Sequence, residues 1–516
     1  MTRRLVVAAA LCLGACSPKQ VAVDPGVAAR AVLEQADANL RAGCFDCLTA
    51  AFNEYESVRN VPPVVEIATR GAVHVSALLA MRERDLGTTD GGYLDRARQL
   101  AATSATVQAE VTPLLDVIDA LPWRGGVGSS NRPGLALMAY RDREQRIEQL
   151  RTTAPRDAFS AYVWLVYACE SGALRTISKA DVDVATPQFA DAPLLAYALA
   201  AVCGVRRTAA FADIVTREPR YKEASFYQGL DASGARKLDD AEARYREAYA
   251  WRPTWPAVTL ALANVLITGE DFDGALDFYD RTLTLVPKFA DALLGKVRTL
   301  TYLSKPEDAV RAADELLALE RYPGDAYYWK AYNELDLQRY DDAWRDVEAA
   351  EKLVRNGDVP KLAGIIAIDR KRLEVAREKL ELARQRNPSD CQALYYLHLV
   401  YAELRQWPQT VSGAVAAAGC ISATEAGLKA EIERIRASDV PEARKARQIA
   451  ARERQIASGV RMRANCWYNG AVANFNLSKR DDAKEMAQRI ADDEQLGERA
   501  RELLARLDNR TDKGAR

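Results

Sequence analysis

Histidine is nearly absent from this chain of 516 residues, which holds only His74 and His398. Zinc sites depend on histidine and cysteine ligands, and histidine is the most common general base in enzymes. A histidine packed inside a helical fold is the simpler interpretation of both residues. The sequence therefore argues against a zinc enzyme or a histidine-base enzyme, and we expect no metal, no cofactor and no catalytic residue.

An excess of charge of one sign is also missing, because 71 Lys and Arg residues balance 72 Asp and Glu residues. Proteins that bind nucleic acid carry surplus positive charge to meet the phosphate backbone. The basic residues between Arg434 and Arg463 are interrupted by Glu442 and Glu453, which favours a solvated helix face. We expect no nucleic-acid partner.

Long hydrophobic runs are missing outside the N-terminus, since no other segment approaches the roughly 18 consecutive apolar residues of a membrane helix. At the N-terminus, Arg3 and Arg4 precede a short apolar stretch from Leu5 to Leu13. This pattern is typical of a signal peptide, which we place at residues 1–15.

The end of the apolar stretch, Leu13-Gly14-Ala15-Cys16, resembles the bacterial lipobox. The resemblance implies that the Cys16 thiol is lipidated and becomes the mature N-terminus, and that Ser17 directs the protein to the outer membrane. We therefore expect a lipid-anchored protein of the bacterial envelope, facing the periplasm rather than the cell surface. An ordinary signal peptide with an incidental cysteine is the alternative.

A repeat runs through the middle of the chain, where alanines recur at 34-residue intervals, at Ala241, Ala275, Ala309 and Ala343. Aromatic residues follow the first two alanines by four positions and prolines by twelve, at Tyr245, Tyr279, Pro253 and Pro287. These residues resemble the tetratricopeptide repeat, a helix-turn-helix unit of that period. The unit returns slightly out of phase at Ala376, Leu380, Ala383 and Pro388, and Trp467 and Ala483 keep its spacing near the C-terminus.

The spacing has a physical basis. A small residue where two helices cross lets their backbones approach to about 8 Å, and the aromatic residue fills the adjoining gap. Proline ends the second helix, because the residue before it disfavours helical backbone. Aspartates at the starts of the second helices are expected to cap free amides, at Asp239, Asp240, Asp273, Asp341 and Asp342.

The predicted fold is all-α, a tetratricopeptide-type α-solenoid of antiparallel helix pairs, since no alternating strand pattern is present. The chain is too long for one compact domain. We divide it into a signal peptide (1–15), a tether (16–27), a degenerate helical-repeat region (28–220), tetratricopeptide repeats (221–420), and a long charged helix with a C-terminal repeat or cap (421–516).

Cysteines favour disulfides if the protein is exported. Cys44 and Cys47 lack the βαβ context of a thioredoxin-like site, and no histidine follows them as haem attachment requires. Cys391 opens a first helix and Cys420 closes its partner, so antiparallel packing brings the two together. Cys169 and Cys203 lie one repeat apart and form the other candidate pair. Cys466 would then be the unpaired cysteine. The connectivity stays a hypothesis, as does the choice between a disulfide and two separate thiols at Cys44 and Cys47.

The glycine-rich segment 124–131 is the remaining candidate for chemistry. It lacks the lysine of a P-loop and the preceding strand of a dinucleotide fold. A loop between helices is the better interpretation.

In tetratricopeptide proteins one face of each first helix lines a concave groove. The resemblance carries that role to Asn264, Arg298, Tyr302, Tyr328, Tyr332, Lys361 and Tyr395. Tyrosine offers a large contact area with a polar tip, which suits recognition of a peptide or a sugar. Asn264 and Arg298 occupy the same groove position of adjacent repeats and are expected to hold a carboxylate. The alternative is that several of these tyrosines only seal seams between helices.

The resemblance implies a membrane-anchored scaffold that mediates protein-protein interactions in the bacterial envelope, in an assembly, secretion or pilus-type complex. Its partner would be an envelope protein or peptide, with the membrane reached through the lipid anchor. The alternative is a glycan-binding or small-ligand-binding lipoprotein, for which residues 108–134 offer the only spare length. An enzyme is the least favoured class, and fold alone does not decide function.

Overall fold

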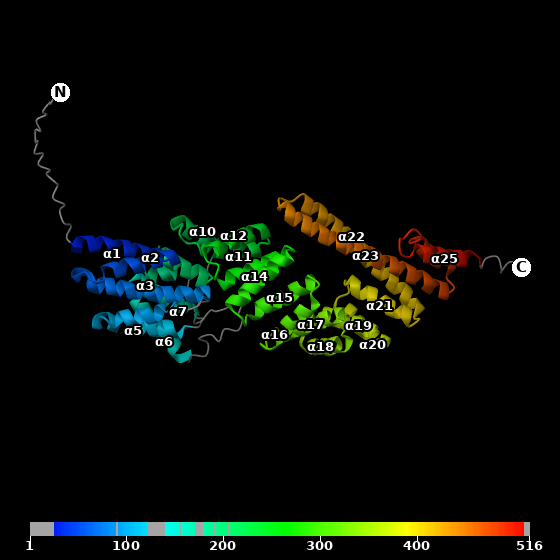
Figure 1. Cartoon of the computed structure of the whole chain (residues 1–516), viewed down its shortest axis with the longest axis horizontal. Coiled ribbons are helices and arrows are strands. Elements are labelled where there is room, and N and C mark those ends of the chain that lie inside the picture. The colour runs from blue at the N-terminus through cyan, green and yellow to red at the C-terminus, as the bar shows by residue number, and fades with distance from the viewer. Residues whose placement is uncertain are drawn as a thin grey trace, which may run out of the picture. The chain divides into compact units, whose positions relative to one another are not determined.

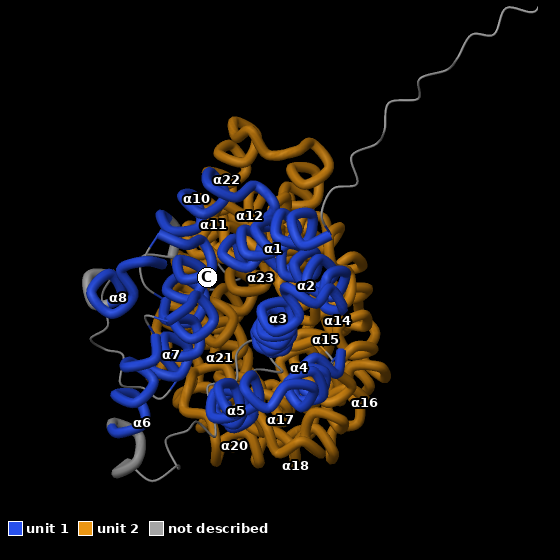
Figure 2. Tube along the Cα trace, turned by 90° about the vertical axis from the view of Figure 1, so that its left-hand side faces the viewer, with its two compact units in different colours: residues 1–85, 89–122, 133–221 blue, residues 86–88, 123–132, 222–516 orange. Residues whose placement is uncertain are grey.

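The computed structural model describes residues 25–88, 91–121, 140–154, 156–170, 179–189, 191–204 and 207–509. These residues form helices and turns without any strand, which confirms the predicted all-α fold. The signal peptide, Cys16 and the glycine-rich segment 124–131 lie outside the described residues. The chain divides into two compact units, which Figure 2 colours separately: unit 1 extends to Tyr221, and unit 2 begins at Lys222 and also takes in residues 86–88.

Unit 1 is a set of short helices around one long buried helix, α3 (Figure 1). Antiparallel neighbours in sequence pack together: α1 on α2, α4 on α5, and α6 on α7. Its elements are α1 (Pro25–Ala42), α2 (Phe45–Val58), the 3₁₀ turn η1 (Pro62–Val64), α3 (Val65–Leu86), α4 (Tyr93–Ala101), α5 (Ala105–Ala120), α6 (Tyr140–Thr153), α7 (Ala158–Glu170), α8 (Lys179–Ala185), α9 (Pro193–Tyr197), the π-helical turn η3 (Ala198–Val202) and α10 (Arg207–Arg217).

Local chemistry explains the first helix pair of unit 1. Gly43 between α1 and α2 has a φ of +70°, a conformation that glycine adopts without strain. A Cβ at this position would also lie 2.5 Å from Leu194, so the backbone approach there requires glycine. Gly43 therefore allows the chain to turn between α1 and α2.

Unit 2 is a regular series of helix pairs followed by a long hairpin (Figure 1). Its elements are α11 (Ala224–Gly234), α12 (Leu238–Trp251), α13 (Pro256–Thr268), α14 (Phe272–Leu285), α15 (Ala290–Tyr302), α16 (Pro306–Leu317), α17 (Pro323–Asp336), α18 (Tyr340–Leu353), α19 (Asp358–Asp369), α20 (Leu373–Arg386), α21 (Cys391–Glu403), α22 (Trp407–Arg436), α23 (Glu442–Asn476), α24 (Arg480–Gln488) and α25 (Gly497–Asn509).

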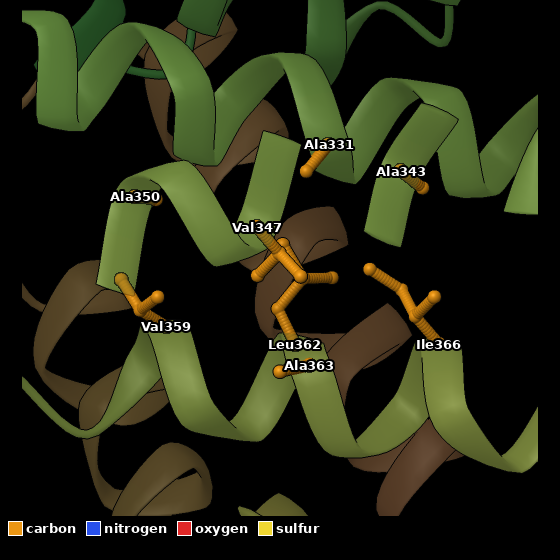
Figure 3. Packing of buried hydrophobic residues seen from close by; sticks show 8 residues of the cluster. All are labelled: Ala331, Ala343, Val347, Ala350, Val359, Leu362, Ala363 and Ile366. Atoms are coloured by element: carbon orange, nitrogen blue, oxygen red, sulfur yellow. The ribbon is translucent and has the colours of Figure 1, made fainter. Parts of the chain in front are cut away.

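The repeating alanines lie at the helix crossings, as the tetratricopeptide pattern predicts. All of them are completely buried in the second helices of the pairs, at Ala241, Ala275, Ala309, Ala343 and Ala376. Figure 3 shows one crossing, where Ala331 and Ala343 come together and Val347, Leu362 and Ile366 fill the space beside them. The helix pairs from α11 to α21 are thus tetratricopeptide repeats in arrangement as well as in sequence period.

Aspartates at the starts of the second helices play two different roles. Asp271 caps α14, because its carboxylate accepts a hydrogen bond from the Gly274 amide at 3.2 Å. Asp239 and Asp240 lie in the first turn of α12 instead, and the cap residue Lys237 makes no side-chain cap bond. Asp273 in α14 and Asp341 and Asp342 in α18 likewise lie in the first turn, where the cap residues are Asp271 and Arg339. The capping prediction is therefore wrong for all five aspartates, which instead lie near the positive end of the helix dipole.

The long charged helix expected after residue 420 is a pair of helices, α22 and α23. Both helices are much longer than a repeat helix: α22 has 30 residues and α23 has 35. Cys420 lies inside α22 rather than at its end, which corrects the prediction that it closes the helix. The division at 420/421 therefore falls within this helix.

Two helices are long and apolar enough to cross a membrane when judged by length and composition alone, α3 with its preceding turn and α22. The apolar window of α3 is mostly buried in unit 1, and α22 packs along α23 and α21.

Three disulfides join cysteines of the described chain: Cys44–Cys47, Cys169–Cys203 and Cys391–Cys420. Cys466 is a buried free thiol, and burial raises its pKa to about 12. Both histidine side chains are packed between helices: His74 stacks on Phe159 with ring centroids 4.5 Å apart, and His398 is fully buried.

Candidate binding groove

The candidate groove lies on the first helices of the pairs, α13, α15, α17, α19 and α21. Asn264, Arg298 and Tyr332 occupy the same position of three successive first helices, and all three side chains are exposed. The second helices bury their alanines at the crossings, so the exposed positions of the first helices are the ones left for a ligand.

An aromatic cluster on α15 and α17 is the main feature of this surface. Trp329 is its centre, with ring centroids 5.2 Å from Tyr328 and 6.1 Å from both Tyr302 and Tyr332. Phe272 extends the cluster, 5.1 Å from Tyr302. Tyr302 is 46 % exposed and Tyr332 is 38 % exposed, so two large rings next to Trp329 are open to solvent. Exposed aromatic rings clustered in this way are typical of binding sites.

Trp329 is a groove residue that the sequence analysis missed. It lies between two predicted residues, Tyr328 and Tyr332, but its own position in the helix is not one of the family's groove positions. Arg298 places its guanidinium carbon 6.0 Å from the centre of the Trp329 ring, within range of a cation–π contact. The indole therefore connects the charged and aromatic parts of the surface.

A shallow cavity of about 210 Å³ opens beside the aromatic cluster. Arg298, Tyr328 and Trp329 form one wall, and Asp325 and Asp358 line the cavity as well. A side chain with a hydrogen-bonding tip fits a space of this size and lining.

Asn264 and Arg298 each have a partner within the chain. The amide oxygen of Asn264 accepts a hydrogen bond of 2.6 Å from the Tyr279 hydroxyl, while Arg298 lies near Trp329. Tyr279 engages the amide oxygen of Asn264, whereas a carboxylate would accept from its amide nitrogen, so the carboxylate clamp of Asn264 and Arg298 stays a prediction.

Lys361 is held between two carboxylates, with Asp358 at 3.0 Å and Asp390 at 2.8 Å from its amine. Burial opposes the charge, but the hydrogen bonds to Asp390 and Asp358 outweigh it and raise the pKa of Lys361. Lys361 is thus protonated, and the two carboxylates offset its charge within the fold. Its ion pair with Asp390 joins α19 to the start of α21.

Two of the predicted tyrosines belong largely to helix seams. Tyr328 packs against the hydrophobic cluster around Ala331 and Val347, and burial raises its pKa. Tyr395 packs against a buried cluster formed by alanines and Ile421 of α22 with Cys466 of α23, and burial raises its pKa to about 12. For Tyr395 the structure favours the seam interpretation over the groove interpretation, because a helix far along the chain covers this position.

Acidic residues end three successive first helices: Asp336 ends α17, Asp369 ends α19 and Glu403 ends α21. All three are exposed, and none forms an ion pair with another residue of the described ranges. Their equivalent positions make a row of negative charge along one edge of the groove, which we call the acidic rim. The rim favours a positively charged ligand.

The hairpin of α22 and α23 returns to the beginning of unit 2, where ion pairs hold it (Figure 1). Arg444 pairs with Asp239 at 2.6 Å and with Glu242, both on α12. Arg452 pairs with Glu270, and Arg447 lies 3.5 Å from Asp271, in the turn between α13 and α14. The series of helix pairs is therefore bridged from its last pair to its first two.

No protein-family model matches the chain, and no curated protein matches it. Among solved structures it is similar to a tetratricopeptide repeat protein from Parabacteroides merdae, with 17 % identity, a TM-score of 0.34, and 55 % of this chain and 98 % of that chain covered. PilF of Pseudomonas aeruginosa is 18 % identical with a TM-score of 0.34, over 38 % of this chain and 89 % of that one. YrrB, a tetratricopeptide protein with an unusual peptide-binding site, is 18 % identical with a TM-score of 0.32, over 36 % of this chain and 95 % of that one.

Proposed function

We propose that this protein is a scaffold that binds an extended segment of a partner protein in the groove of unit 2. The observation that carries the proposal is the exposed aromatic cluster, in which Tyr302, Trp329 and Tyr332 lie together on neighbouring first helices. Tyrosine and tryptophan supply large contact areas at low entropic cost, and they are enriched at the points of highest binding energy in interfaces.

The charges of the groove indicate the chemistry of the segment. Asp336, Asp369 and Glu403 offer three negative charges at equivalent positions without an ion pair in the described ranges. A segment with lysine or arginine residues would meet this rim while its apolar or aromatic side chains cover Tyr302 and Tyr332. Complementary charge mainly fixes register and accelerates association, whereas the rings supply most of the affinity.

We further propose that the scaffold is lipid-anchored in the outer membrane of a bacterial envelope through Cys16, with the repeats in the periplasm. The match of Leu13-Gly14-Ala15-Cys16 to the lipobox supports the lipid anchor, and Ser17 supports the outer membrane as its destination. One acyl chain binds a membrane only marginally, so the anchor is expected to carry more than one. A role in an assembly, secretion or pilus-type complex follows as the finer form of this proposal.

Site-specific photo-crosslinking in the native envelope tests the groove. A photoreactive phenylalanine analogue replaces Tyr302 in the groove or, as the control, the exposed Leu353 at the end of α18. The proposal predicts one protein crosslinked from position 302 and absent from position 353. Crosslinking of the same proteins from both positions would show that the groove is not the binding site.

The lipid anchor has a separate test. Cys16→Ser is expected to leave an uncleaved or soluble form, and mass spectrometry of the wild-type protein should find acyl chains on Cys16. A variant that is still processed and membrane-bound, with no acyl mass on the wild type, would refute the anchor and leave the groove proposal intact.

A further inference from the structure

Unit 1 contains a cleft that the groove proposal does not use. Two cavities, of about 400 Å³ and about 250 Å³, share His74, Glu110 and Arg156 as lining residues. Helices α1, α2, α3, α5, α6 and α7 supply the walls. The larger cavity alone has the size of a small-molecule site. We call the two cavities together the His74 cleft.

The acidic residues of the His74 cleft all have partners on its walls. Asp37 accepts a hydrogen bond from the Tyr55 hydroxyl, and Glu110 pairs with Arg70 at 3.0 Å. Asp157 accepts hydrogen bonds from the amide and hydroxyl groups of Ser160, at 2.8 Å and 3.2 Å. Only Glu110 has its charge offset by an arginine, because the donors to Asp37 and Asp157 are neutral, so two carboxylate charges of the cleft remain.

Three arginines of the cleft are not engaged in this way. Arg41 at the end of α1, Arg146 on α6 and Arg156 just before α7 line the cavities. None of the three forms an ion pair with any other residue in the part of the chain that the structure describes. The cleft thus presents more uncompensated positive charge than negative charge, which favours an anionic ligand.

His74 lies where the two cavities meet and is only 5 % exposed. Its ring stacks on Phe159, and its Nδ1 lies 4.0 Å from Asp157, which is too far for a hydrogen bond. Burial lowers the pKa of His74, so the ring is neutral and still offers one N–H donor and one acceptor. A buried ring that makes no hydrogen bond to the described residues around it is suited to bind the ligand itself.

The other walls of the cleft are apolar. Leu40, Ile67, Phe159 and Phe189 line the larger cavity beside the arginines. Gly71 allows the Tyr55 ring to form part of this wall, since a Cβ at position 71 would lie 2.3 Å from that ring. The cleft therefore combines a cationic side with an apolar side, as a ligand with an apolar body and a charged head requires.

We propose that the His74 cleft binds a small organic anion, with its oxyanion head at Arg41 and Arg156 and its apolar body against Phe159, Phe189 and Ile67, all of which line the larger cavity. Carboxylate and phosphate groups share the required chemistry, because both accept the paired N–H donors of a guanidinium. This site is independent of the groove and of the partner protein proposed for unit 2.

Calorimetric titration of the full chain with three six-carbon probes tests the proposal. Hexanoate and hexyl phosphate carry an alkyl chain within one methylene of that of hexylammonium, but the opposite charge. Saturable binding of hexanoate, hexyl phosphate or both, with no binding of hexylammonium, is the expected result. Binding of hexanoate alone would identify a carboxylate ligand, and binding of hexyl phosphate alone a phosphate ligand. Equal binding of all three probes, or of none, would overturn the proposal.

Variants locate the binding. The double variant Arg41→Gln and Arg156→Gln should weaken the anionic probe by at least about tenfold, because each guanidinium lost removes a charge-assisted hydrogen bond. Arg151→Gln is the matched control, since Arg151 is exposed on α6, pairs with Glu148 and lies outside the lining. Both altered arginines of the double variant are exposed, so its melting temperature should stay near that of the wild type. An unchanged affinity in a folded double variant would overturn the assignment.

Discussion

Arg444 on α23 lies 2.6 Å from the carboxylate of Asp239 on α12, which brings the C-terminal hairpin to the first helix pair of unit 2. The Arg444 side chain is only 6 % exposed and also pairs with Glu242. A buried charge held by two opposite charges is costly to leave without them. Arg444 is therefore the residue on which the attachment of the hairpin depends most.

Arg444→Glu should detach the tip of the hairpin, because it places a third carboxylate against Asp239 and Glu242. Breaking a buried ion pair costs about 3–5 kcal/mol, and this loss should appear as faster amide hydrogen exchange over residues 437–458. Lys429→Glu is the control, since Lys429 is exposed and its ion pair among the described residues is with Glu425 in its own helix. If exchange in this segment is unchanged in Arg444→Glu, the ion pairs do not hold the hairpin.

The pKa of Glu334 predicts that the free energy of unfolding falls as the pH rises. Burial, followed by the charge of Asp346, raises its pKa to about 8 from 4.5. The folded chain therefore keeps a proton that the unfolded chain releases above pH 4.5, so folding stability should fall between pH 4.5 and about 8, by at most about 1.4 kcal/mol per pH unit.

Glu334→Gln should reduce this dependence. Urea unfolding at pH 5, 6.5 and 8 measures the slope, and Glu374→Gln serves as a control on an exposed carboxylate paired with Arg377 in its own helix. The same slope in Glu334→Gln as in the wild type would show that Glu334 is ionised in the fold.

A pair of glycine substitutions tests the packing of the repeats. A Cβ at Gly295 would lie 2.2 Å from the Tyr279 ring, so Gly295→Ala should cost about 1–3 kcal/mol through overpacking. Gly419 in α22 meets nothing within 4 Å, so Gly419→Ala should instead stabilise the helix by up to about 1 kcal/mol. We expect the melting temperature to fall in Gly295→Ala and to rise in Gly419→Ala. A melting temperature that falls in neither variant would contradict the repeat packing.

Much of unit 2 was predictable from sequence, because residues at a helix crossing must be small wherever the backbones approach. Ala241 and Ala275 show this at a fixed period, and both are fully buried. Unit 1 shows no such period: α7 is buried on nearly every side, so its sequence lacks the alternation that reveals which face packs.

The candidate sites were less predictable, since they depend on contacts between distant parts of the chain. Arg444 and Asp239 look like ordinary surface charges in sequence, and only the return of α23 brings them together. The same helix covers Tyr395, whose own helix carries no mark of this burial. Trp329 went unnoticed because the family pattern assigns the groove to its neighbours.

The most direct test of the central claim measures how tightly the groove binds the segment of the partner crosslinked at position 302. Calorimetry compares the wild type with the double variant Tyr302→Ala and Tyr332→Ala, and with Leu353→Ala as an exposed control outside the groove. Both tyrosines are exposed, so the variant should keep its circular dichroism spectrum and melting temperature. We predict at least about thirtyfold weaker binding, equivalent to about 2 kcal/mol, in the double variant alone. A folded double variant that binds the segment as tightly as the wild type would contradict the account.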